Sequence, residues 1–194
     1  MYVYRGFLRY LNAELSMIKK IIKRLKVSQK KWENSEYFDV LWKMRIKQMA
    51  AFVPENCSVM DLGCGLEWLK EFLHEGCTYY GVDYKLRSDN TIVCDFNKRQ
   101  FPLNKVDVSF VSGCLEYVKD YKWFINQISL ASSICVLSYC TIDCFPNNRE
   151  RVSRNWVNHL SEKELIQLFQ TVGFKLRNRS LTESQNLILE FIKS

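Results

Sequence analysis

Two acids and two glycines have the types and spacing best suited to chemistry in this sequence. Asp61 precedes Gly63 and Gly65 at the end of a short apolar run, and Asp83 ends the next such run. Because glycine leaves no side chain between backbone and ligand, a cofactor can lie across this turn. A carboxylate at Asp83, beside the tip of the first run, suits paired hydrogen bonds to ribose hydroxyls. The pattern therefore predicts a nucleoside site.

The elements that must position these residues are two buried strands with a helix between them. Residues 57–62 and 78–82 are short apolar runs, which favour buried strands. Residues 66–73 place apolar side chains on one face, which predicts an amphipathic helix directly after the glycines. A dinucleotide fingerprint requires a third glycine three positions after Gly65, where Trp68 stands. The sequence therefore argues against NAD.

The segment from Asp61 to Glu67 resembles the first motif of the class I S-adenosylmethionine-dependent methyltransferases, acidic-x-Gly-x-Gly-x-Gly. It departs from that motif at its last position, where Glu67 replaces a glycine. An acid before the glycines can meet the positively charged amino end of the ligand. The segments that resemble later motifs follow in the family's order: Tyr80–Asp83, Cys94–Asn97, Val106–Gly113 and Leu115–Val118. The resemblance spans residues 57–118.

This resemblance implies a site for S-adenosylmethionine, whose product is S-adenosylhomocysteine. Asp83 would bind the ribose, while Asp95 would take the adenine amino group with Phe96 against the ring. The departure at Glu67 bears on how closely the loop approaches the methionine part. The implied cofactor-binding residues are Asp61, Gly63, Cys64, Gly65, Asp83, Tyr84, Asp95, Phe96, Ser112 and Gly113.

The resemblance also implies an α/β fold: a Rossmann-like, seven-stranded, mostly parallel sheet with an antiparallel last strand and helices on both faces. The sequence pattern adds further strands, which we expect at residues 91–94, 106–111, 133–139, 174–181 and 186–192. Helices are expected at residues 37–52 and 120–130. Ser161 and Glu164 form a capping box, with Leu160 and Leu165 as its hydrophobic staple. This predicts a last helix that ends near Val172.

The segment 140–160 has no clear period and leaves the carboxyl end of the predicted fifth strand, where open α/β sheets bind ligands. A hydroxyl acceptor usually needs a base, and His159 is the first candidate. Tyr117 and Tyr139 would end on the cofactor side and could orient an acceptor. For each of the three, packing or hydrogen bonding to the backbone is the alternative.

Three arginines crowd the same segment. Arg149 and Arg154, together with Trp156, are candidate substrate-binding residues, and Arg151 lies between them. Arginine binds phosphate or carboxylate through paired hydrogen bonds, which would suit a phosphorylated or nucleotide-linked sugar. Ordinary solvation of a loop is the alternative. The Trp156-x-Asn158-His159 segment also resembles small methyltransferases of surface-polysaccharide pathways.

The net charge of +7 is concentrated at the N-terminus. Residues 1–31 hold nine Lys/Arg and one acid, which leaves 19 basic and 20 acidic residues in 32–194. We predict a basic amphipathic helical extension over residues 1–33 and a methyltransferase domain over 34–194. The extension could contact an anionic membrane surface or a protein, or pack on its own domain. The neutral remainder gives no reason to expect nucleic acid.

Composition favours a cytoplasmic protein, with peripheral attachment at the inner membrane surface as a further expectation. The chain has 194 residues and eight cysteines, most of them in or beside predicted strands. No CxxC pair occurs and only two histidines are present, so no metal site is expected. Signal-peptide and membrane-span patterns are not found.

Taken together, the sequence predicts a methyltransferase that moves the methyl of S-adenosylmethionine to a small-molecule or saccharide-precursor acceptor, on oxygen rather than nitrogen. One alternative is a non-catalytic scaffold that binds S-adenosylmethionine and holds a partner. Another is an RNA methyltransferase recruited by residues 1–31.

Overall fold

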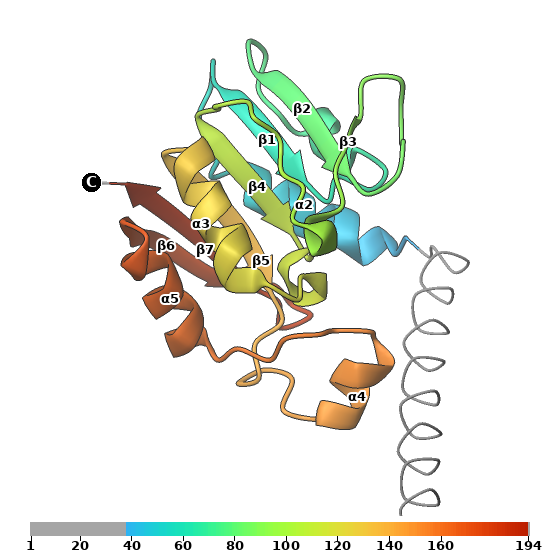
Figure 1. Ribbon diagram of the computed structural model, residues 1–194, viewed down its shortest axis with the longest axis vertical. Helices are drawn as coiled ribbons and strands as arrows, with labels where there is room; N and C mark the ends of the chain where they lie inside the picture. Colours follow the sequence, from blue (N-terminus) through green and yellow to red (C-terminus); the bar gives the residue numbers. More distant parts are fainter. Residues whose placement is uncertain (1–37, 194) are drawn as a thin grey trace, which may run out of the picture. The chain divides into compact units, whose positions relative to one another are not determined.

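The computed structural model describes residues 38–193, which form one seven-stranded sheet in the order β3-β2-β1-β4-β5-β7-β6. The predicted extension and its boundary at residues 33–34 lie outside the described residues. Strands β1 to β5 run parallel, and β7 is antiparallel to both β5 and β6 (Figure 1). The strands are β1 (Ser58–Leu62), β2 (Thr78–Asp83), β3 (Ile92–Val93), β4 (Val108–Ser112), β5 (Ile134–Tyr139), β6 (Phe174–Leu181) and β7 (Leu187–Lys193). The predicted fold class is confirmed.

Helices cover both faces of this sheet (Figure 1). On one face, α3 (Tyr121–Ala131) and α5 (Glu162–Thr171) bury Phe124, Ile128 and Leu165 in a core shared with the strands. On the other, α2 (Val40–Ala50) and the short 3-10 helix η1 (Trp68–Glu71) bury Met49 and Leu69. Both faces of the central strands β1, β4 and β5 are thus largely removed from water, which explains their apolar sequences.

The helix cap predicted from the sequence is present. In α5 the Glu164 amide donates to the Ser161 hydroxyl at 3.3 Å, and the Ser161 amide donates to the Glu164 carboxylate at 2.8 Å. Leu160 and Leu165, the predicted staple, are buried in the same core cluster. These contacts are local in sequence, so the residue types alone were enough to predict them.

The helix expected over residues 66–73 does not form. Glu67 has φ 55° and ψ 29°, in the left-handed region, and only the four residues of η1 follow it. A helix beginning at Leu66 would need residue 67 in the right-handed region. The expectation was therefore wrong, and no α-helix N-terminus stands behind the glycine turn.

The segment 140–160 contains a short helix that the sequence pattern did not indicate, α4 (Asn148–Ser153). Asn147 caps it, with its side-chain oxygen accepting from the Arg149 amide at 3.0 Å. Figure 1 places α4 beyond the carboxyl ends of β4 and β5. The segment is therefore an ordered cover at the edge where a ligand is expected.

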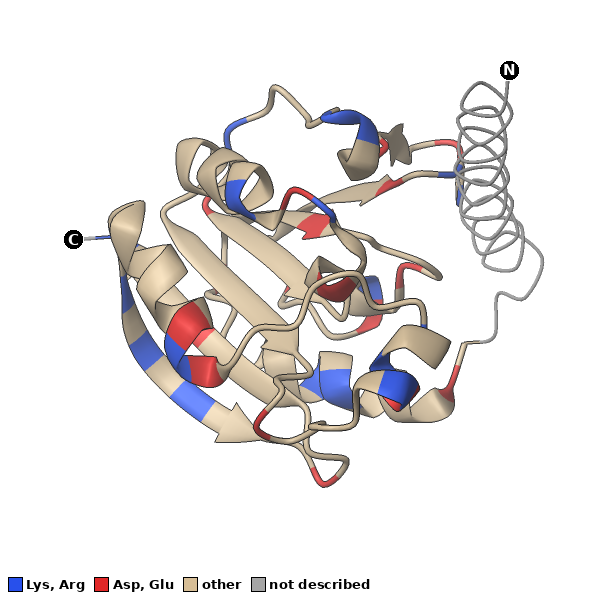
Figure 2. Ribbon diagram, turned by 60° about the horizontal axis from the view of Figure 1, so that its bottom comes forward, with Lys and Arg blue, Asp and Glu red and all other residues tan. Residues whose placement is uncertain are grey.

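Charged residues are distributed over the described elements, and lysines and arginines alternate along β6 (Figure 2). Arg179 binds Glu162 of α5 at 2.6 Å, and Arg177 binds the buried Glu190 of β7. Charges along this outer strand discourage pairing with another sheet. None of the described helices is long and apolar enough to cross a membrane.

Candidate functional site

Asp83 and the glycine turn are brought together as the spacing predicted. Asp83 ends β2 with only 4% of its surface exposed, and the Gly65 amide donates to its Oδ2 at 3.1 Å. Its Oδ1 accepts from the Lys85 amide at 3.2 Å and from the Arg87 guanidinium at 3.1 Å. The carboxylate is thus fixed beside the turn at the carboxyl edge of β1 and β2.

The turn packs tightly against other parts of the chain. Gly63 has φ +84°, and a Cβ there would lie 2.8 Å from Sγ of Cys114, beyond β4. A Cβ on Gly65 would lie 2.8 Å from the ring of Phe38. A side chain at either position would therefore collide with the protein's own side chains. These glycines therefore hold the turn, the loop after β4 and the start of α2 in close contact.

Asp61 and Cys64 lie inside the protein. The Tyr79 hydroxyl donates to Asp61 at 2.9 Å, and burial raises the pKa of Asp61 to about 7 despite that bond. Cys64 is also buried, and burial raises the pKa of its thiol. Asp61 is thus held by Tyr79 beneath the turn, and its expected contact with the amino end of the ligand stays a prediction.

The proposed adenine residues have separate environments. Asp95 caps the 3-10 helix η2 (Phe96–Lys98) by accepting from the Asn97 amide at 3.0 Å, and it pairs with Lys98 at 3.1 Å. The Phe96 side chain packs against Phe124, with ring centroids 4.7 Å apart, and is buried in the core. The ring contact expected for Phe96 is thus not available to its side chain, because the core holds it. Tyr84 is partly exposed, and its ring lies under the cations of Lys85 and Arg87.

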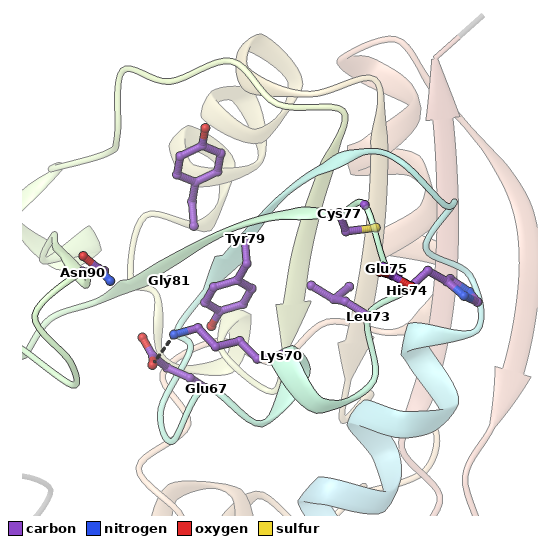
Figure 3. Close-up of a pocket in the computed structure, with 11 residues that line it drawn as sticks. Glu67, Lys70, Leu73, His74, Glu75, Cys77, Tyr79, Gly81 and Asn90 are labelled. Carbon is purple, nitrogen blue, oxygen red and sulfur yellow. Dashed lines mark hydrogen bonds and ion pairs between the residues drawn. The ribbon is translucent and has the colours of Figure 1, made fainter.

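Glu67, the departure from the glycine motif, turns its side chain toward β2 and the β2–β3 connection. One oxygen pairs with Lys70 at 2.7 Å (Figure 3). The other accepts from the Ser88 hydroxyl at 2.9 Å. A Cβ on Gly81 would lie 2.9 Å from this carboxylate, so Gly81 makes the approach possible. Glu67 is therefore a clamp on the connection that carries Arg87.

A pocket of about 620 Å³ lies beside Glu67, on the face of β2 left uncovered by the short η1 (Figure 3). Its lining includes Lys70, Tyr79 and Gly81. Every candidate cofactor residue is described, and none of them lines this pocket. Glu67 borders the pocket, whereas Gly63 and Gly65 do not.

Replacing Glu67 with glycine, which restores the motif, should lower stability. Glycine relieves about 1 kcal/mol of left-handed strain, but the change also removes charge-assisted bonds of about 1.5–3 kcal/mol. We expect a net loss of about 1 kcal/mol, seen as a melting temperature about 2–4 °C lower. Glu67→Gln, which keeps the Ser88 contact and the strain, is the matched control. A Glu67→Gly protein that melts above the wild type would show that strain dominates.

A buried polar group lies at the carboxyl edge of β4 and β5. Arg45 of α2 donates to the Ser112 hydroxyl and to the Asn186 side chain, both at 3.1 Å. Gly113 has φ +61°, and a Cβ there would lie 2.7 Å from the Arg45 guanidinium. Burial lowers the pKa of Arg45, an effect that nearby Glu116 opposes. Ser112 and Gly113 thus position a cation beside the glycine turn.

Glu116 lies in the segment Leu115–Val118 that resembles a family motif, but the sequence interpretation gave it no role of its own. It lies in the 3-10 helix η3 (Leu115–Tyr117), with 1% of its surface exposed, and its Oε1 accepts from the Cys140 amide at 2.9 Å. Its Oε2 has no hydrogen-bond partner among the described residues. Burial raises the pKa of this carboxyl. The available signal was an acid within an otherwise apolar segment after β4.

Arg151 organises the segment over this edge. It is fully buried and donates to the carbonyl oxygens of Cys140, Thr141 and Phe145 at 2.7, 3.2 and 3.3 Å. Its Nε also donates to Nδ1 of His159 at 2.9 Å. The arginine predicted to accompany an anion site is thus engaged by the protein's own backbone.

These contacts bear on two of the base candidates. Because Nδ1 of His159 accepts from a cation, the neutral ring carries its proton on Nε2 and has no second lone pair to offer. Desolvation and the Arg151 charge also lower the pKa of His159. Tyr139 donates to the Asn158 side chain at 2.6 Å and accepts from the Leu160 amide at 3.0 Å. Both sets of contacts favour a structural role.

The remaining residues predicted to bind the methyl acceptor lie in the region of Trp156. Its indole donates to the Tyr117 hydroxyl at 3.3 Å, and burial raises the pKa of Tyr117. Arg154 pairs with Glu150 at 2.8 Å and lies over the Trp156 ring, whereas Arg149 is exposed on α4. The structure therefore brings Tyr117 and Trp156 together but assembles no common anion site from the three arginines.

A family model described as "Methyltransferase domain" matches residues 32–178. No curated protein matches the chain. At the low identities of the structural matches that follow, the likeness shows the fold alone.

Three solved structures illustrate the likeness. A chain of the complex between the Haloferax volcanii Trm112 methyltransferase activator and a putative methyltransferase aligns with TM-score 0.63 and 15% identity, over 78% of this chain and 89% of that one. Burkholderia thailandensis 1,6-didemethyltoxoflavin-N1-methyltransferase, holding its substrate and S-adenosylhomocysteine, gives 0.60 and 13%, over 91% and 86%. The O-methyltransferase NcsB1 from neocarzinostatin biosynthesis, with S-adenosylhomocysteine and 1,4-dihydroxy-2-naphthoic acid, gives 0.63 and 16%, over 81% and 57%.

Proposed function

This chain belongs to the methyltransferase-domain family and has the Rossmann-like methyltransferase fold, and from that premise we propose that it methylates a small molecule with S-adenosylmethionine. The observation that carries the proposal is the meeting of Gly65, Asp83 and Gly113 at one carboxyl edge of the parallel strands. Open α/β sheets bind ligands at this edge.

The residues present fit this methyl donor, which supplies an electrophilic methyl group on a positively charged sulfur. Asp83 offers a fixed carboxylate to the ribose, and Asp95 offers its carboxylate to the adenine amino group. Arg45 is the cation that would bind the methionine carboxylate, because its guanidinium lies on Gly113. Arg87, which pairs with Asp83, must share that carboxylate with the ribose.

The acceptor we propose is a hydroxyl-bearing small molecule or saccharide precursor. NcsB1 acts on oxygen and the Burkholderia enzyme on nitrogen, so the fold serves both. The eight cysteines are free thiols, which supports a reducing, cytoplasmic location. Contact of residues 1–31 with a membrane surface or a protein stays a prediction.

Purified full-length protein should bind S-adenosylmethionine and release S-adenosylhomocysteine when a small-molecule extract of cells is added. Product formation is followed by mass spectrometry, with boiled protein and extract-free reactions as controls. Binding without product would favour the scaffold alternative. Product formed only with RNA, through binding that weakens as salt rises, would favour the RNA alternative. Absence of S-adenosylmethionine binding would contradict the proposed function.

A further inference from the structure

Glu116 has an unusual environment for a carboxylate. It is almost completely buried, one oxygen accepts from the Cys140 amide, and the other has no partner among residues 38–193. Leaving a buried acceptor unpaired is costly, so such a group calls for an explanation. One explanation that bears on function is that a bound molecule donates a hydrogen bond to Oε2 of Glu116.

The position of Glu116 indicates what kind of molecule could supply the missing donor. Glu116 follows β4 and Cys140 follows β5, and because these strands are parallel neighbours both residues lie at the ligand edge. Cys114, two residues earlier, contacts Gly63 of the glycine turn. Asn186 connects Arg45 with Cys140, since its Oδ1 accepts from the Arg45 guanidinium and from the Cys140 thiol, both at 3.1 Å.

We propose that Oε2 of Glu116 accepts the hydrogen bond of the methyl acceptor's O–H or N–H group and takes its proton during transfer; this inference rests on the proposed function. In that step the acceptor's lone pair forms a bond to the methyl carbon. The bond between that carbon and sulfur breaks, and its electron pair stays on sulfur as neutral S-adenosylhomocysteine. The proton moves to Oε2. A raised pKa from burial brings the carboxylate closer to the working range of a base.

The proposal also limits the substrate class. While the Glu116 carboxylate is ionised, Oε2 can only accept a hydrogen bond, so alcohols, phenols and amines fit the site. A carboxylate acceptor has no proton to give and would be repelled by Glu116. Glu116 therefore selects acceptors whose nucleophilic atom carries hydrogen.

The first test measures binding in the full chain and needs no acceptor. Glu116→Gln keeps an oxygen for the Cys140 amide but removes the charge. If Oε2 faces the transferred methyl, this change should leave S-adenosylhomocysteine affinity within about twofold and weaken S-adenosylmethionine about fivefold, because only the latter carries a charged sulfur. Calorimetric titration of both compounds gives the ratio.

Two variants make the result specific. Glu190→Gln alters a buried carboxylate that Arg177 and Asn178 already satisfy, and it should change neither affinity. Arg45→Met should weaken both compounds alike, since both carry the methionine carboxylate. Thermal melting checks that each variant is folded.

The second test uses the small-molecule extract. Glu116→Gln should reduce methyl transfer at least about 100-fold while S-adenosylhomocysteine still binds. Equal weakening of both compounds would place Glu116 on the amino-acid part of the donor and overturn the inference. So would wild-type behaviour of Glu116→Gln in the binding ratio. If the wild type binds neither compound, the proposed function itself fails.

Discussion

Asp83→Asn should weaken binding of S-adenosylhomocysteine by about 30- to 100-fold. The Asp83 carboxylate is held beside the turn by the Gly65 amide and lies at the edge where the ribose is proposed. A hydrogen bond to a charged group contributes about 1.5–3 kcal/mol, and asparagine offers only one accepting oxygen. Calorimetry on the purified full chain measures the effect directly.

Asp107→Asn is the matched control for this change. Asp107 also accepts from a backbone amide and a hydroxyl, those of Ser58 at 2.7 and 2.6 Å, but it precedes β4 at the opposite edge of the sheet. The control should bind S-adenosylhomocysteine like the wild type. Wild-type affinity in Asp83→Asn would instead remove the ribose contact from the proposal.

Arg151→Leu should lower the free energy of unfolding by about 3 kcal/mol, which corresponds to a melting temperature about 6–12 °C lower. Leucine fills part of the volume but leaves the carbonyl oxygens of Cys140, Thr141 and Phe145 without their donor. It also removes the cation stacked 4.8 Å from the Trp156 ring centroid. Differential scanning calorimetry measures both the temperature and the enthalpy of unfolding.

Arg154→Leu, at the residue that follows α4, separates the role of Arg151 from a general effect of losing an arginine in this segment. Arg154 lies over the same Trp156 ring but is half exposed and pairs only with Glu150 in the described contacts. Its loss should cost less than about 1 kcal/mol. Arg151→Lys, which keeps the charge and some of the donors, should fall between the two. Melting temperatures of Arg151→Leu and Arg154→Leu that agree within about 2 °C would contradict the prediction. The hydrogen bonds from Arg151 to backbone carbonyl oxygens would then not stabilise residues 140–160.

The sequence was sufficient where the determining contacts are local or periodic. The apolar runs that became β1 and β2, and the capping box of α5, depend on residues within a few positions of one another. The spacing of Gly65 and Asp83 worked for a related reason. Parallel strands end at the same edge, so two strand ends close in sequence become neighbours in space.

The expected helix after Gly65 and the expected role of His159 both depend on contacts that residue type and spacing do not reveal. Apolar spacing favoured a helix after Gly65, but Glu67 contacts Ser88, which lies on the far side of β2. His159 has the residue type of a base, but Arg151 occupies its Nδ1. Neither contact can be predicted from the hydrophobic periodicity or the motifs of the sequence.

The sequence by itself therefore determined the strands, their shared edge and the acids placed along it, because side-chain type and spacing dictate those features. Only the tertiary structure decided which buried polar groups have hydrogen-bond partners within the protein and which one keeps an oxygen without a partner among the described residues. Arg151 and Glu116 are both charged residues near the same edge, yet one is saturated by carbonyl oxygens and the other keeps an unpaired oxygen. That difference arises from burial and from which groups the folded chain brings within hydrogen-bond distance, and residue type and spacing alone do not encode it.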